Sequence, residues 1–149
     1  PQWVFGPGTY SFASDELIAC SYTENDAWKI AMLHISSKML LAIETPYSEM
    51  GRGDLKVGDG KIVFIGGAPS LPISVVQIDL ASSKWWELRK SNNLEIDDGY
   101  LSTAQPVEFP TENGQTAHAF YYPPKNGDFD GPAGEKPPLL VKSHGGPTG

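Results

Sequence analysis

Cysteine is nearly absent from this sequence: Cys20 is the single one among 149 residues. One thiol cannot close a disulfide within the chain, which excludes the class of small secreted domains held together by disulfides. Low cysteine usage fits a reducing compartment, and we expect an intracellular location, either cytoplasmic or organellar. Cys20 lies in an apolar run and is predicted to be a small core residue rather than a nucleophile.

Positive charge is also scarce. The chain has 11 Lys and Arg against 18 Asp and Glu, for a net charge of −7, and the pair Arg89-Lys90 is the nearest approach to a basic cluster. Without a basic patch, neither nucleic acid nor an anionic membrane surface is an expected partner. The apolar runs, such as 62–65 and 139–141, are far shorter than the roughly 20 residues that cross a bilayer.

The sequence lacks the spacings of metal and cofactor sites. Its histidines, His34, His118 and His144, are scattered, and no Cys or second His stands at ligand spacing from them. Segment 128–131 faintly resembles a calcium loop but lacks the further ligands of that motif. No Gly-x-Gly sequence extends into a dinucleotide or phosphate motif. We therefore predict no metal and no cofactor.

Residues that break helices are common throughout the chain. Gly (16) and Pro (13) together exclude a helical bundle or coiled coil, while 40% hydrophobic residues suffice for a buried core. Short runs rich in β-branched and aromatic residues, separated by Gly, Asn, Asp, Ser and Pro, predict a mainly β fold.

Two segments of the chain resemble each other. Residues 30–41 match residues 75–86, with Ile35 opposite Leu80 at an offset of 45 and Lys38 opposite Lys84 at 46. A period near 45 residues is typical of the blades of a β-propeller. The pattern predicts strands over 9–12, 17–22, 28–35, 39–44, 61–65, 73–80 and 85–89, with a loop over 66–72. Two blades alone would leave faces and edges uncovered, so we expect missing partners.

The adjacent pair Trp85-Trp86 lies in the last predicted strand of the second copy. Exposed aromatic residues often form binding platforms. Because neighbouring residues on a strand point to opposite faces, we expect one ring in the core and the other against a following blade.

The repeat ends near Ser91. An acidic, polar stretch over 92–102 predicts a linker, and strands over 107–109 and 116–122 flank Asn113-Gly114, the dipeptide most typical of a hairpin turn. The run 139–141 is continuous and apolar, which predicts a strand buried on both faces.

A glycine-rich segment, His144-Gly145-Gly146, follows that run. Ligands meet open α/β sheets just beyond the ends of buried strands, and glycines let a backbone N–H approach a substrate closely. Preorganised N–H donors of this kind form oxyanion holes. The alternative is a glycine-rich turn that binds nothing.

The last 45 residues resemble the entry to the catalytic domain of the prolyl oligopeptidase family of serine peptidases, most closely its acylaminoacyl-peptidase and dipeptidyl-aminopeptidase branch. The residues that carry the resemblance are Pro106, Val107, Glu108, Phe109, Pro110, Thr111, Asn113, Gly114, Ala119, Phe120, Tyr121, Tyr122, Pro123, Pro124, the run 136–141 (Lys-Pro-Pro-Leu-Leu-Val) and the segment 144–148 (His-Gly-Gly-Pro-Thr). The resemblance implies a β-propeller followed by an α/β-hydrolase domain. We therefore expect two terminal propeller blades over 1–102 and the first strands of the hydrolase domain over 103–149.

The resemblance also implies roles for single residues. It places an oxyanion-hole N–H at Gly146, with Gly145 and His144 shaping the turn. The Gly-x-Ser-x-Gly nucleophile motif is absent from the chain, and the family order Ser…Asp…His puts the whole triad beyond Gly149. We expect no catalytic residue in this chain, and no activity from it alone.

Two functions remain open at this point. In the first, the intact protein is a serine peptidase that cleaves short peptides, and this chain contacts the peptide substrate, the remaining blades and the rest of the hydrolase domain. Acylated N-termini, dipeptides and internal bonds are all possible substrates. In the second, the chain is a non-catalytic β-rich module that binds other proteins. A Gly-x-Ser-x-Gly sequence after Gly149 would distinguish the first from the second.

Overall fold

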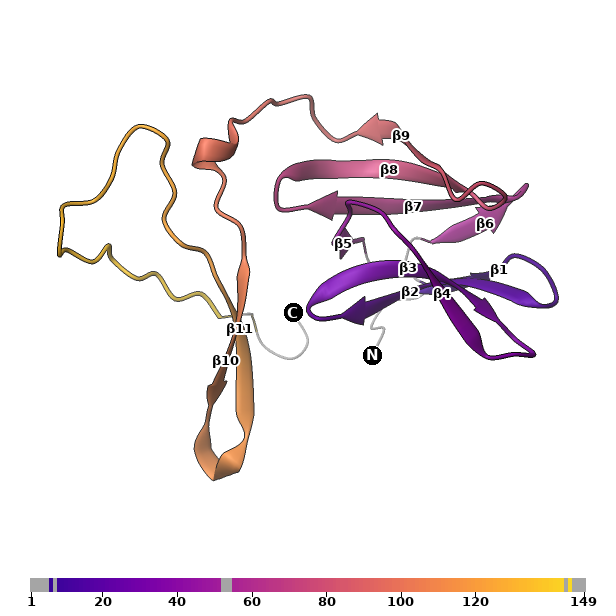
Figure 1. Ribbon diagram of the computed structural model, residues 1–149, viewed down its shortest axis with the longest axis horizontal. Helices are drawn as coiled ribbons and strands as arrows, with labels where there is room; N and C mark the ends of the chain where they lie inside the picture. Colours follow the sequence, from indigo (N-terminus) through magenta and orange to yellow (C-terminus); the bar gives the residue numbers. More distant parts are fainter. Residues whose placement is uncertain (1–5, 7, 52–54, 144, 146–149) are drawn as a thin grey trace.

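The computed structural model describes residues 6, 8–51, 55–143 and 145. These residues form two antiparallel sheets that lie one over the other and a two-stranded hairpin that projects away from them (Figure 1). The mainly β fold expected from the sequence is confirmed. Among the described residues, no helix is long and apolar enough to cross a membrane.

The first sheet has four strands in sequence order, joined by tight turns. Between its second and third strands, Asn25 and Asp26 have φ of 50° and 61°, as in the two-residue turns that match the twist of hairpins. The predicted strands are confirmed to within two residues at each end. The strands are β1 (Tyr10–Phe12), β2 (Leu17–Glu24), β3 (Ala27–His34) and β4 (Met39–Ile43).

The second sheet repeats this order with one strand interrupted. Two short strands, β5 and β6, pair along the same long strand, β7, and β8 and β9 follow on its other side. Its strands are β5 (Glu49–Met50), β6 (Lys56–Gly58), β7 (Lys61–Ala68), β8 (Leu71–Asp79) and β9 (Trp85–Lys90).

The predicted loop over 66–72 is wrong. β7 continues through Gly66 and Gly67 to Ala68, and the turn is only two residues long before β8 begins at Leu71. The two glycines remain in the sheet because they pair with Met50 and Glu49 of β5. That pairing is between segments distant in the chain, so the local glycine signal for a turn was misleading.

The repeat predicted from the sequence corresponds to equivalent turns in the two sheets. Lys38 in the β3–β4 turn and Ser83 in the β8–β9 turn both have φ of 55°. The registers agree, because Leu40 pairs with Leu33 and Trp85 pairs with Ile78, each at an offset of 45. The structure thus places Lys38 opposite Ser83 rather than Lys84. The offset is 45 residues throughout this part of the repeat.

One hydrophobic core joins the two sheets. The first sheet contributes Ala19 and Ile30, the second contributes side chains from β7 and β8, and the intervening segments add Tyr47 and Leu55. All of these are 2% exposed or less. Burying one such aliphatic side chain stabilises a fold by about 1.5–3 kcal/mol, so this core holds the sheets face to face. The contributions from β7 and β8 are Ile62, Phe64, Val76 and Ile78.

Tyr47 follows the first sheet in the chain and packs its buried ring on the second sheet. Its ring meets Phe64 and Trp85 edge to face, with centroids 5.9 and 5.6 Å away. Its hydroxyl donates to Glu87 Oε1 at 2.9 Å, and the Ser74 hydroxyl donates to the same oxygen at 3.2 Å. The buried phenol therefore has a polar partner, which removes the cost of leaving its hydroxyl unsatisfied.

The two adjacent tryptophans point to opposite faces of the second sheet. Trp85 pairs with Ile78 on the core side and contacts Tyr47, whereas Trp86 pairs with Gln77 on the other side and is 46% exposed. The prediction that the two rings point to opposite faces is confirmed, but the prediction of a core tryptophan is wrong: Trp85 touches Tyr47 at the edge of the core and is still 38% exposed. Contact of the other ring with a further blade stays a prediction.

The hairpin follows a linker without strands. The linker contains the short helix η1 (Asp98–Tyr100), and the hairpin consists of β10 (Gln105–Pro110), η2 (Glu112–Gly114) and β11 (Thr116–Tyr121). Asn113 and Gly114 have φ of 60° and 71°, so the predicted turn dipeptide occupies the loop. Both predicted strands are confirmed.

The predicted strand over 139–141 is wrong. Leu139, Leu140 and Val141 form no strand and are 76%, 90% and 80% exposed. A strand buried on both faces needs neighbouring strands for its backbone groups, and none of the described strands pairs with this run.

The adjacent glycines of β7 allow a matched test of the core. A Cβ at Gly66 would lie 2.7 Å from a ring carbon of Phe64 and 3.0 Å from Tyr47, whereas a Cβ at Gly67 would make only ordinary contacts, the nearest 3.4 Å from Ile73. We expect Gly66→Ala to lower the free energy of unfolding by about 1–3 kcal/mol, the range for overpacked cores. Gly67→Ala should leave it unchanged or raise it slightly. Urea unfolding of both variants measures the difference, and equal effects would contradict this account of Gly66.

A second prediction concerns pH. The hydrogen bond from Tyr47 holds the pKa of the Glu87 carboxyl below its ordinary value of 4.5, with a smaller contribution from Lys90. Because the folded pKa is depressed, Glu87 contributes stability above pH 4.5 that is lost as the pH falls below it. Tyr47→Phe should cost about 1–2 kcal/mol at pH 7 and weaken this acid dependence.

The control for this pH experiment is Tyr10→Phe. Tyr10 is 59% exposed, so losing its hydroxyl should change neither the stability nor its pH dependence. Denaturant unfolding of the protein and both variants across the acid range makes the comparison. An acid dependence in Tyr47→Phe identical to that of the unsubstituted protein would show that Glu87 does not depend on Tyr47.

Candidate functional site

The oxyanion segment predicted from the sequence is only partly described. Gly145 lies in an exposed, irregular stretch, while His144 and Gly146 lie outside the described residues. The roles of the Gly146 N–H, Gly145 and His144 therefore stay predictions.

The segment that leads to Gly145 is tied to the linker at the base of the hairpin. The Ser102 hydroxyl donates to the carbonyl of Pro123 at 2.5 Å. The Tyr100 hydroxyl donates to the carboxylate of Asp128, and this bond raises the pKa of Tyr100. The two contacts join the stretch before β10 to the stretch after β11, so the chain enters and leaves the hairpin at one place.

The loop that faintly resembles a calcium site has a structural explanation. Asn126 Oδ1 accepts from the backbone N–H groups of Asp128 and Phe129, at 2.9 and 3.2 Å, and forms a local turn. Because the Asp128 carboxylate is engaged by Tyr100, it acts as an anchor for the loop.

A cleft of about 480 Å³ lies between the two sheets and the base of the hairpin. Turns of both sheets form one wall, and the residues flanking and within the hairpin form the other. Two carboxylates, Asp26 and Glu49, and three aromatic rings, Trp28, Phe120 and Tyr122, face this space. The full lining is Asn25, Asp26, Ala27, Trp28, Ser48, Glu49, Pro69, Thr103, Ala104, Pro106, Phe120 and Tyr122.

The lining of this cleft suits binding rather than hydrolysis. Ser48 and Thr103 supply hydroxyls, but none of the lining residues is a histidine that could take a proton from them. Aromatic walls with a few polar groups are typical of ligand pockets. The sequence did not predict this cleft, because Asn25-Asp26 indicates only a turn. The opposite wall begins at Thr103, more than 75 residues later in the chain.

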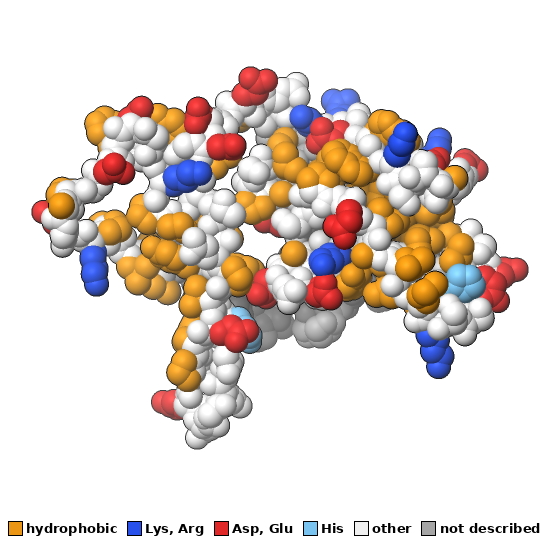
Figure 2. Space-filling model, viewed as in Figure 1, with side chains coloured by type: hydrophobic (Ala, Val, Ile, Leu, Met, Phe, Trp, Pro, Cys, Tyr) orange, Lys and Arg blue, Asp and Glu red, His pale blue; other side chains and the backbone are white. Residues whose placement is uncertain are grey.

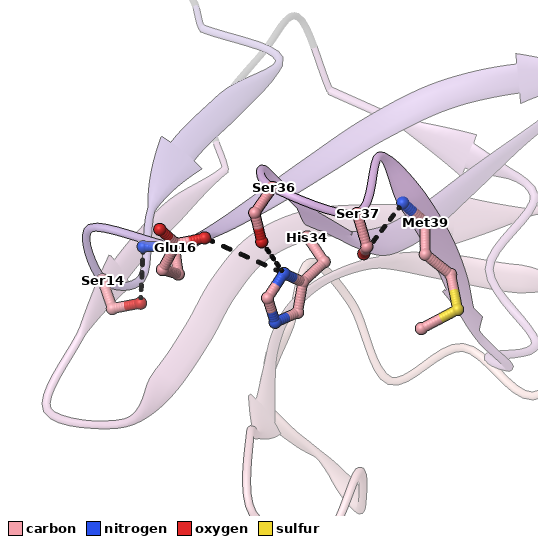
Figure 3. Close-up of polar contacts among 6 residues, drawn as sticks. All are labelled: Ser14, Glu16, His34, Ser36, Ser37 and Met39. Atoms are coloured by element: carbon pink, nitrogen blue, oxygen red, sulfur yellow. Dashed lines mark hydrogen bonds and ion pairs between the residues drawn. The ribbon is translucent and has the colours of Figure 1, made fainter.

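A histidine, a carboxylate and a serine meet at one end of the first sheet (Figure 3). The His34 Nδ1 lies 3.4 Å from the Ser36 hydroxyl oxygen and 4.0 Å from Glu16 Oε2. A serine triad needs the hydroxyl on one ring nitrogen and the carboxylate on the other. Here both partners approach the same nitrogen, so this cluster cannot relay a proton from serine to histidine.

The position of His34 in the repeat explains its contacts. Its counterpart 45 residues later is Asp79, whose Oδ1 accepts from both the N–H and the hydroxyl of Ser82, at 2.8 and 2.7 Å. Both residues end a strand and hold the following turn. We therefore assign the cluster of Figure 3 to turn formation.

The remaining titratable candidates that the structure describes have no catalytic arrangement. His118 Nδ1 lies 3.4 Å from Glu108 Oε1 on the exposed face of the hairpin. Burial raises the pKa of the Cys20 thiol, which disfavours the nucleophilic thiolate. In the part of the chain that the structure describes, no three His, Cys, Asp or Glu side chains gather as a metal site would require.

Comparison with known proteins places the fold. No protein-family profile and no curated protein sequence matches the chain. Among solved structures, it is similar to a puromycin-hydrolysing peptidase of Mycobacterium tuberculosis, with 29% identity and a TM-score of 0.83. It is also similar to puromycin hydrolase, with 27% identity and a TM-score of 0.81, and to a mutant of puromycin hydrolase complexed with PGG, with a TM-score of 0.80.

The extent of these matches is informative. Each covers 93% of this chain but only 21% of the neighbour, so the chain spans about a fifth of the length of those enzymes. The family resemblance seen in residues 106–148 is thereby supported by the fold of almost the whole chain. In sequence motif and in structure, this chain is similar to a segment of peptidases of the prolyl oligopeptidase family.

Proposed function

We propose that this chain is the junction between two domains of a serine peptidase. Residues 1–102 are the last two blades of a β-propeller, and residues 103–149 begin the α/β-hydrolase domain. The catalytic triad lies outside these 149 residues, and the Gly146 N–H stabilises the oxyanion. The observation that carries the proposal is the match to a puromycin-hydrolysing peptidase at a TM-score of 0.83 over 93% of the chain.

The outer faces of the two sheets support the blade assignment. Tyr10 and Phe12 lie together on the face of the first sheet opposite Ala19, with ring centroids 6.2 Å apart, and both are 59% exposed. On the far face of the second sheet, Ile73 and Trp86 are similarly exposed. Apolar faces of this kind need cover, and a further blade on each side would supply it.

The hairpin supports the second half of the proposal. Val107, Phe109 and Tyr121 lie on one face of it, and all three are exposed. Hydrophobic side chains line one side of the projecting hairpin in Figure 2. An isolated two-stranded hairpin is marginally stable in water, so this face fits a position in a larger sheet domain.

The cleft lies at the proposed domain boundary, where it fits a role in receiving substrate. Its aromatic walls and carboxylates suit a peptide with an apolar side chain and a free amine. The structural neighbours hydrolyse puromycin, which makes that compound the first substrate to test.

The experiment is to isolate the natural protein that carries this sequence, measure its intact mass and assay it for hydrolysis of puromycin. We expect a mass of about 60–70 kDa, from about seven blades of about 45 residues and a hydrolase domain. We also expect hydrolysis that a fluorophosphonate serine reagent abolishes. A polypeptide of 16.1 kDa with no hydrolytic activity would instead support the binding-module function.

A substitution tests the oxyanion donor. In the intact enzyme, Gly146→Val should lower kcat by about 10²–10³-fold, because the side chain displaces the backbone N–H that the transition state needs. The matched control is Gly131→Val, since a Cβ at Gly131 meets nothing within 4 Å. Circular dichroism checks that both variants fold. Near-normal turnover in Gly146→Val would remove Gly146 from the site.

A further inference from the structure

The fourth strand of the first sheet is an edge of that sheet among the residues that the structure describes. β4 reads Met-Leu-Leu-Ala-Ile, and its first three side chains are 50%, 45% and 54% exposed. Among the described strands, only β3 pairs with it. The equivalent outer strand β9 carries Glu87, Arg89 and Lys90, and charges of this kind deter pairing with another chain. β4 contains no charge.

The free hydrogen-bonding groups of this edge follow from the bonds of β3. Trp28 donates its N–H to Ser48 on one side of β3, and Ile35 donates to Glu16 on the other. Since donors alternate along a strand, the even-numbered residues of β3 bond toward β4. Their partners in β4 are the odd-numbered residues. The backbone groups of Leu40 and Ala42 therefore point outward.

We propose that β4 pairs with β4 of a second copy of this chain, antiparallel, about a two-fold axis at Leu41. In this register Leu40 of each copy faces Ala42 of the other, and the two residues of each pair exchange N–H···O bonds. Met39 faces Ile43, and Leu41 faces its own symmetry mate. Every cross-strand pair within β4 is then apolar on apolar.

The residues that flank β4 select this register. Lys38 precedes the strand and Glu44 follows it, and both are exposed. Because 38 and 44 are equally far from 41, the two-fold axis sets each lysine beside the glutamate of the other copy. A parallel, in-register pairing would instead place lysine beside lysine and glutamate beside glutamate, which costs binding energy. The surface is thus complementary to itself in one orientation.

The size of the contact sets the expected affinity. Pairing of one five-residue strand lies at the low end of specific interfaces, so the dimer should form at micromolar concentration. The proposal does not depend on peptidase activity, because β4 lies in the first sheet and takes no part in the cleft lining.

The experiment is a charge exchange in the intact protein that carries this chain, followed by sedimentation equilibrium over a range of concentrations. We expect Lys38→Glu and Glu44→Lys each to weaken the dimer by about tenfold or more, since each places like charges together twice. An equimolar mixture of the two variants should restore the dimer, because both ends of the mixed pair then join opposite charges. Lys84→Glu, in the second sheet, is the matched control and should have no effect.

A further variant tests the backbone pairing. Ala42→Pro removes an outward N–H without removing a bond to β3, so it should abolish the dimer and leave the far-ultraviolet circular dichroism unchanged. The proposal is overturned if the unsubstituted protein is monomeric at about 100 μM, a concentration well above the dissociation constant expected for this small interface. It is equally overturned if the mixed charge variants stay monomeric, or if folded Ala42→Pro still forms the dimer.

Discussion

The packing of Tyr47 into the hydrophobic core is the constraint on which the rest of the structure depends. The chain passes from the first sheet to the second through this residue, whose ring fills the space between Phe64 and Trp85. Gly66 must lack a side chain for the ring to fit, and Glu87 must reach in to accept its hydroxyl hydrogen bond. One aromatic side chain thereby holds together the parts of β7 and β9 that face the core.

Much of the fold was predictable because its signals are local. Alternating apolar residues located the strands of both sheets, and Asn113-Gly114 located the hairpin turn. The failures share one cause, which is pairing with distant residues. Gly66 and Gly67 stay extended because β5 holds them, and the run 139–141 remains uncovered because no described strand lies beside it. Neither fact is encoded in the neighbouring sequence.

The candidate site was likewise predictable only where its signal is local. The glycines at 145 and 146 were recognisable from the sequence because backbone freedom is a property of the residue itself. The cleft was not, because its walls come from turns of both sheets and from the hairpin, and only the folded chain brings them together. The apparent triad around His34 is the converse case: three suitable residue types are close in space, yet both partners approach one nitrogen.

The ties at the base of the hairpin have a consequence for how this protein can vary. The hydrogen bond from Ser102 to Pro123 joins the two ends of the hairpin. The main chain before and after the hairpin therefore keeps its path whatever the length of the segment between them. Added or deleted residues at the tip, around 111–115, would extend into solvent and leave the downstream backbone where it is. Related proteins are therefore free to differ in length at this tip while keeping the same approach to the glycine segment.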